Sequence, residues 1–177
     1  MSERYQIHGE LGRGGLGVVH RAFDTQLGRD VAIKRVRVDS DEPVEELTEN
    51  LIREARTLSS LKHPHIVTIH DVGRDEQGPF VVMELLEGET LDVIIEKAAL
   101  PLDDFKEFAV QSLEGIIAAH SAGLIHRDLK PSNLMLVWLP SGKFQVKILD
   151  FGLASFSQAP ADKTADHDDS ILGSIHF

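Results

Sequence analysis

The chain has 177 residues, 42% of them hydrophobic and 27% charged, and its 18 Lys and Arg residues against 29 Asp and Glu residues give a formal net charge of −11. This length fits one domain, or two small lobes that share a cleft, and the composition excludes wholesale disorder. The acidity argues against nucleic acid as the main partner, because a phosphate backbone requires a basic surface.

The chain contains no cysteine, which excludes disulfides, thiol catalysis and zinc sites built on cysteine. Its first residues lack the apolar run of a secretory signal, and no stretch approaches the roughly 18 apolar residues of a membrane span. We therefore expect a cytoplasmic protein without a membrane span.

Residues 5–38 read as short strands separated by glycines, and Gly12, Gly14 and Gly17 fit the pattern G-x-G-x-x-G. A dinucleotide-binding loop would lead into a helix, whereas the residues after Gly17 are strand-like. A glycine-rich hairpin whose amides close over phosphates fits better. Taken alone, the same glycines are also typical of ordinary turns.

The next strand, around residues 31–36, places Ala32 and Lys34 on one face. Lys34 has two interpretations at this point, as a solvated surface residue or as a cation directed at an anionic ligand. A helix is predicted over 43–61, where apolar residues recur at helical spacing. Glu54 lies about 60° from the centre of that apolar stripe, at its rim, where a carboxylate could hold Lys34 for phosphate contact.

The rest of the chain changes from strands to helices. Thr90 is expected to cap a short helix, and Asp103 and Gly123 to be the N-cap and C-cap of a longer one. The predicted elements are strands 66–72 and 79–86, helices 91–98 and 103–122, and short strands or loops around 124–126, 133–138 and 144–149. We infer an α+β fold, in which an antiparallel sheet with one helix precedes a helical part across a cleft.

Two polar segments carry the chemistry. Residues 126–133, His-Arg-Asp-Leu-Lys-Pro-Ser-Asn, place a carboxylate, cations and an amide in one loop after the long helix. Asp150 begins Asp-Phe-Gly after an apolar strand. One carboxylate can accept a proton while the other, with the amide, holds a hard cation through oxygen ligands.

Together these motifs stand in the order and spacing of the protein kinase family. The sequence resembles the catalytic domains of bacterial Ser/Thr protein kinases of eukaryotic type, from about Tyr5 to the end of the chain. The resemblance implies a protein-kinase-like fold, with an N-lobe at 1–84, a hinge at 85–90 and a partial helical C-lobe at 91–177.

The resemblance further implies transfer of the ATP γ-phosphoryl group to Ser or Thr hydroxyls of a protein substrate. Asp128 would be the base that orients the acceptor hydroxyl, Lys130 would contact the γ-phosphate, and Asn133 and Asp150 would hold Mg²⁺. The ATP-binding residues implied are Leu11, Gly12, Gly14, Gly15, Gly17, Val19, Ala32, Lys34 paired with Glu54, Met83, Glu84, Leu86 and Met135.

Within this set the resemblance assigns an adenine sandwich to Val19, Ala32 and Met135, and adenine-edge hydrogen bonds to the backbone of Glu84 and Leu86. Met83 would guard a back pocket. An internal column of stacked side chains is implied for Leu58, Ile69, His126 and Phe151.

The segment after Gly152 contains candidate phosphosites, and Arg127 beside Asp128 is typical of kinases that respond to a negative charge there. A solvated acidic loop is the alternative reading of this segment. The candidates are Ser155, Ser157, Thr164 and Ser170.

The sequence also departs from the family. It stops at Phe177, before the family's Ala-Pro-Glu motif, so we expect a truncated C-lobe. The helix at 103–122 would then keep an apolar stripe without its usual cover, which favours self-association. A catalytically weak nucleotide-binding or scaffold protein, or a purely structural partner, is therefore the alternative to an active kinase.

Overall fold

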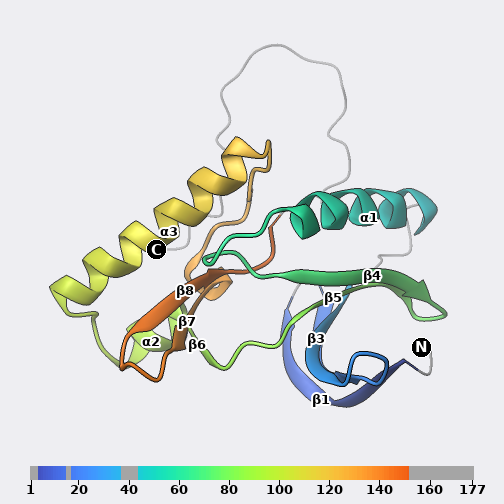
Figure 1. Ribbon diagram of the computed structural model, residues 1–177, viewed down its shortest axis with the longest axis horizontal. Helices are drawn as coiled ribbons and strands as arrows, with labels where there is room; N and C mark the ends of the chain where they lie inside the picture. Colours follow the sequence, from blue (N-terminus) through green and yellow to red (C-terminus); the bar gives the residue numbers. More distant parts are fainter. Residues whose placement is uncertain (1–3, 15–16, 37–43, 152–177) are drawn as a thin grey trace.

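The computed structural model describes residues 4–14, 17–36 and 44–151. Its first part is a five-stranded antiparallel sheet with the strand order β1-β2-β3-β5-β4. Helix α1 (Val44–Ser60) lies along this sheet and packs against β4 and β5 (Figure 1). The strands are β1 (Tyr5–Gly14), β2 (Gly17–Asp24), β3 (Arg29–Val36), β4 (Ile69–Asp75) and β5 (Gly78–Glu84).

The second part lies toward the other end of the molecule and combines a small sheet with two helices (Figure 1). Its three strands pair antiparallel in the order β6-β7-β8, and α3 packs against β8. No helix in the described part of the chain is long and apolar enough to span a membrane. The elements are β6 (Gly88–Thr90), α2 (Leu91–Lys97), α3 (Leu102–Ser121), the short 3-10 helix η1 (Pro131–Asn133), β7 (Leu134–Trp138) and β8 (Phe144–Ile148).

Most predicted elements are present within a few residues of their predicted bounds, and three details differ. Helix α3 begins at Leu102 with Pro101 as its N-cap, so the prediction of Asp103 as N-cap was wrong. Asp103 lies instead in the first turn, where a negative charge interacts favourably with the helix dipole. Ala122 is the C-cap, and Gly123 follows it with a φ of 76°, a conformation that glycine adopts without strain.

The third difference lies in the predicted hinge, whose last three residues form strand β6. Gly88 explains this, because a Cβ at this position would lie 2.2 Å from the carbonyl oxygen of Leu136 on β7. Only a residue without a side chain lets the two backbones approach so closely. Residues 124–126 are a loop, which was one of the two predicted forms. The lobe and hinge boundaries themselves stay predictions.

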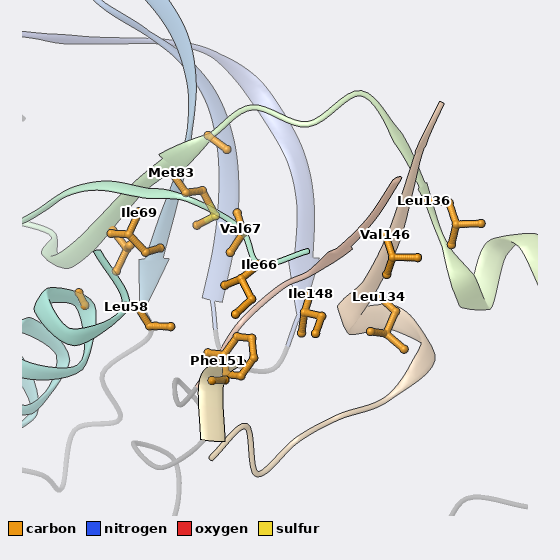
Figure 2. Packing of buried hydrophobic residues seen from close by; sticks show 14 of the residues in the cluster. Leu58, Ile66, Val67, Ile69, Met83, Leu134, Leu136, Val146, Ile148 and Phe151 are labelled. Carbon is orange, nitrogen blue, oxygen red and sulfur yellow. The ribbon is translucent and has the colours of Figure 1, made fainter. Parts of the chain in front are cut away.

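One apolar core joins the two parts of the molecule. Figure 2 shows Leu58 of α1, Ile69 of β4 and Phe151 in one cluster with Ile66 and Ile148. Phe151, Ile66 and Ile148 are at most 2% exposed, so the segment that links β8 to residue 151 is anchored in this core. Burial of each such side chain contributes about 1.5–3 kcal/mol.

β8 is an edge strand of the small sheet, and residues from outside the sheet form hydrogen bonds with its outer edge. The backbone N–H of Val146 donates to Oε1 of Gln111 on α3 (2.7 Å), and its carbonyl oxygen lies 3.0 Å from Nδ1 of His65. Ile148 exchanges backbone hydrogen bonds with the 65–67 segment: its N–H donates to His65, and its carbonyl accepts from Val67. These contacts hold α3 and the 65–67 segment against the strand that leads to Asp150.

Helix α3 has a small buried face and a large exposed apolar face. Its buried residues are Phe108, Ser112, Gly115 and Ala119. The predicted apolar stripe is only partly covered, because Ile116 is half-buried whereas Phe105, Leu113 and Ile117 are more than half exposed. Leu102 and Val110, elsewhere on the helix, are also more than half exposed.

Candidate active site

A cavity of about 480 Å³ lies between the two parts of the molecule. It is lined by the β1–β2 hairpin, β3, the end of β5 with the residues after it, the 128–135 segment and Asp150. The predicted site residues on its wall are Leu11, Gly12, Gly14, Gly17, Val19, Ala32, Lys34, Met83, Glu84, Leu86, Asp128, Lys130, Asn133, Met135 and Asp150. Two predicted site features lie outside the described residues: Gly15 and the side chain of Glu54.

The glycine-rich segment forms a tight hairpin between two strands, as the sequence predicts. Gly14 and Gly17 are register partners at the ends of β1 and β2. Gly17 has a φ of 143°, a backbone conformation that side chains disfavour. The hairpin therefore forms the cavity wall largely with backbone, which allows a ligand to approach its amides closely.

Lys34 is buried rather than solvated, which excludes the surface interpretation of this residue. It is 4% exposed on β3, and its Nζ lies 2.7 Å from Oδ2 of Asp150. This ion pair brings together a strand of the first sheet and the segment after β8, which are far apart in the sequence. The predicted partner Glu54 lies on α1, but its side chain is outside the described residues.

The 126–133 loop gathers two polar side chains around the carboxylate of Asp128. Lys130 Nζ lies 2.7 Å from Oδ2 of Asp128. Asn133 Nδ2 donates to the backbone carbonyl of Asp128 (2.7 Å) and to its Oδ2 (3.3 Å). Arg127 and Asp150 both have positive φ, 64° and 56°, which costs free energy in residues other than glycine and is concentrated at functional sites.

His126 connects this loop to the segment that carries Asp150. Its Nδ1 accepts the backbone N–H of Asp128 (3.3 Å), so its Nε2 carries the proton donated to the Leu149 carbonyl (2.7 Å). The ring is 4% exposed, and burial lowers its pKa below the ordinary value of 6.5. A neutral imidazole in this tautomer holds both segments at once. Its ring centroid also lies 4.7 Å from that of Phe151.

Met83 separates the main cavity from a smaller apolar space behind it. It lines the main cavity and also the small space walled by Leu58, Ile69 and Phe151. Figure 2 shows Met83 close to Ile69. The role of Met83 as the guard of a back pocket stays a prediction. The residues predicted for the internal column are all buried.

The sequence analysis missed several residues that line the cavity. Leu85, Ser132 and Leu149 adjoin predicted site residues, so their neighbours in the chain were the available signal. Val67 and Thr90 do not adjoin a predicted site residue in the sequence, and only the tertiary fold places them in the cavity wall. The missed residues are Arg13, Val67, Leu85, Thr90, Ser132 and Leu149.

The donor set of the cavity suits Mg²⁺ when phosphates share the ion. Within the described residues, no cluster of three or more His, Asp or Glu side chains could hold a metal. Asp150 and Asn133 offer a carboxylate and an amide oxygen on one wall, and Mg²⁺ is commonly held by one or two such ligands together with substrate phosphates. Asn133 directs its Nδ2 to Asp128, which leaves Oδ1 as its polar atom for a cation.

Residues 5–175 match the family model described as the protein kinase domain. The chain belongs to this family. The resemblance stated from the motifs is therefore confirmed. The candidate phosphosites of this kinase domain, Ser155, Ser157, Thr164 and Ser170, lie outside the described residues.

Curated relatives include bacterial serine/threonine-protein kinases. The chain is 36% identical to PrkC of Bacillus subtilis over 178 residues, which cover all of this chain and 26% of PrkC. It is 37% identical to PknA of Mycobacterium tuberculosis over 185 residues, which cover all of this chain and 41% of PknA. The chain thus spans about a quarter to two fifths of the length of these relatives.

Solved structures confirm the predicted fold class. The PknI kinase domain of Mycobacterium tuberculosis matches 86% of this chain with a TM-score of 0.71 at 26% identity, and 60% of that chain is covered. Rad53 in complex with AMP-PNP matches 85% of this chain with a TM-score of 0.72 at 29% identity, and 39% of that chain is covered.

Proposed function

We propose that this chain is the catalytic region of a Ser/Thr protein kinase, which transfers the γ-phosphoryl group of ATP to hydroxyl groups of protein Ser and Thr residues. One observation carries the proposal: Lys34 of β3, Asp128 and Asn133 of the 126–133 loop, and Asp150 after β8 line a single cavity. The relatives named above are Ser/Thr kinases, and Rad53 was solved with an ATP analogue.

The proposed nucleotide site has an apolar end and a charged end. Val19, Ala32 and Met135 would enclose the adenine ring, and the backbone of Glu84 and Leu86 would bond its edge. The hairpin from Leu11 to Gly17, with Gly12, Gly14 and Gly15, would cover the phosphates. Lys34 would contact the α- and β-phosphates, since its ammonium lines the cavity and can neutralise phosphate charge.

Asp150 and Asn133 would hold Mg²⁺, which neutralises charge on the transferred phosphoryl group when it is bound. Asp128 would orient the acceptor hydroxyl and accept its proton while the new oxygen–phosphorus bond forms and the bond to the departing ADP oxygen breaks. Lys130 lies 2.7 Å from Asp128 and would contact the γ-phosphate. The reaction would take place in the cytoplasm, where ATP is available as the phosphoryl donor.

The test uses the purified 177-residue chain. Its melting temperature is measured with and without Mg-ATP, and the transfer of labelled phosphate to a basic protein is followed. We expect stabilisation by Mg-ATP and transfer that Asp128→Asn abolishes. Transfer that survives in Asp128→Asn would contradict the assigned role, and a chain that shows neither effect would overturn the proposal.

A nucleotide-binding or scaffold protein without transfer is the second candidate. The observation in its favour is that the described cavity brings together the residues assigned to ATP, which is all that nucleotide binding without transfer requires. Stabilisation by Mg-ATP without detectable transfer in the same experiment supports this candidate over the first.

The exposed face of α3 supports a proposal of self-association. An antiparallel pairing of two copies brings Val110 of one helix opposite Leu113 of the other and the Phe105 end opposite the Ile117 end, so apolar groups cover each other. Because these side chains are more than half exposed, their burial stabilises a dimer. Sedimentation tests this: Leu113→Glu should yield monomers, whereas Glu107→Lys, a charge change beside this face, should leave the dimer.

A further inference from the structure

The strand that leads to Asp150 is tied to the first sheet by a second ion pair that the proposed function does not use. Lys147 on β8 is 8% exposed, and its Nζ lies 2.7 Å from Oε1 of Glu84 at the end of β5. The same Oε1 accepts the backbone N–H of Thr68 (2.7 Å), and the Thr68 carbonyl accepts the N–H of Glu84 (3.0 Å). A buried ammonium needs such a partner, because an unpaired buried charge is costly.

The two ion pairs have matching spacing. Lys34 is the register partner of Val81 on β5, and Glu84 lies three residues beyond Val81. Their partners, Asp150 and Lys147, are also three residues apart. The two ion pairs therefore join the 147–150 segment to the first sheet at two separate points, one on β3 and one at the end of β5.

The polarity of the two pairs is reversed. The sheet contributes a cation at Lys34 and an anion at Glu84, and the 147–150 segment contributes an anion at Asp150 and a cation at Lys147. A segment docked in the opposite direction would place like charges together, which is unfavourable. The arrangement therefore favours one direction of the segment over the opposite one.

The two ion pairs are expected to respond differently when a nucleotide binds. In the proposed function, Lys34 turns to phosphates and Asp150 to Mg²⁺, so their mutual pair weakens when Mg-ATP binds. Glu84 faces Lys147 through its carboxylate, and only its backbone is assigned to adenine. This second tie consequently persists in the complex.

We propose that Glu84 and Lys147 are positioning residues, which hold the 147–150 segment in register with the adenine-binding end of β5 and so place Asp150 for Mg²⁺. This inference rests on the proposed function. It assigns a role to a carboxylate side chain in the predicted hinge and to a lysine that lies outside the cavity wall.

The test uses Lys147→Met, which removes the charge at similar length, and Lys147→Arg, which restores it. Glu84→Gln removes the charge of the partner. Asp75→Asn is the matched control for Glu84→Gln, since Asp75 pairs with Arg35 at 2.7 Å, is part of the same sheet and lies outside the cavity wall.

The first readout is the gain in ATP affinity on adding Mg²⁺, measured by calorimetry with ATP in EDTA and in excess Mg²⁺. We expect Lys147→Met and Glu84→Gln to reduce this gain about tenfold, the scale found when groups that orient metal ligands are removed. Lys147→Arg should restore the gain, and Asp75→Asn should leave it unchanged.

The second readout is amide hydrogen exchange across residues 147–150 without nucleotide. We expect exchange in Lys147→Met and Glu84→Gln to be at least about tenfold faster than in the Asp75→Asn control. If both variants match the control in exchange, the positioning role is overturned. If the wild type fails to bind ATP while exchange rises as expected, the proposed function fails and the positioning of the segment stands.

Discussion

Two kinds of ion pair start from neighbouring residues of β3. Arg35 pairs with Asp75 inside the first sheet at 2.7 Å, and Lys34 pairs at the same distance with Asp150 beyond that sheet. Successive side chains of a strand point to opposite faces, so one face of β3 carries a structural pair and the other faces the cavity. Equal distances therefore do not imply equal roles. The effect of losing an ion pair depends on which segments that pair connects.

The largest expected effect is on phosphoryl transfer. Lys34→Met and Asp150→Asn should each lower the transfer rate by at least about 10²-fold, because each removes a charge from the place where phosphate charge develops. Asp150 has a positive φ that Asn also tolerates, so this variant changes the charge without a new backbone strain. Rates of labelled phosphate transfer near those of the wild type would contradict both roles.

The contact between β6 and β7 should be sensitive to a single added methyl group. Gly88→Ala places a Cβ 2.2 Å from the Leu136 carbonyl, so β6 must separate from β7. We expect a loss of about 3 kcal/mol in the free energy of unfolding, measured with urea. Gly9→Ala on β1 is the control, since no atom lies within 4 Å of its added Cβ. Equal losses in the two variants would exclude the close approach as the cause.

The pair within the sheet should affect stability alone. Asp75→Asn should lower the free energy of unfolding by about 2 kcal/mol, because Arg35 and Asp75 are both largely buried and share two hydrogen bonds. The affinity for ATP should stay unchanged. The control is Asp30→Asn, which breaks an exposed pair with Arg21 and should cost less than about 1 kcal/mol. A large loss of ATP affinity in Asp75→Asn would remove the distinction between the two faces of β3.

The smallest effect concerns acid stability. Burial lowers the pKa of His63, His70 and His126 below 6.5 in the folded chain, whereas the unfolded chain keeps the ordinary value. Below about pH 6.5 the unfolded chain binds more protons, so the free energy of unfolding should fall as the pH is lowered toward 5. His126→Asn should make this dependence shallower. An unchanged slope in thermal melts across this range would show that His126 does not contribute.

The site residues could be predicted from the sequence, whereas the ion pair proposed to position the 147–150 segment could not. The glycines, Lys34, Asp128 and Asp150 carry recognisable residue types at fixed spacing, and they line one cavity. The pair of Glu84 with Lys147 could not be predicted in this way, because it joins positions 63 residues apart that only the tertiary fold brings together.

Predictions from local sequence signals also failed where backbone packing sets the boundary of an element. Asp103 is a favourable N-cap residue, yet α3 begins one residue earlier after Pro101. Gly88 lies in the segment that was predicted as a hinge, whereas the structure uses its missing side chain for a close strand contact. In both cases the composition indicated the region correctly, and the packing of neighbouring segments set the boundary.

The contacts along the outer edge of β8 have a consequence for association between molecules. A strand edge with open amides and carbonyls is a template on which a foreign strand can assemble, and this is a common route to fibrils. Here the Gln111 amide and the His65 ring fill the hydrogen-bonding positions of Val146, and the 65–67 segment fills those of Ile148. Gln111, His65 and the 65–67 segment together thus protect this edge from β-type aggregation.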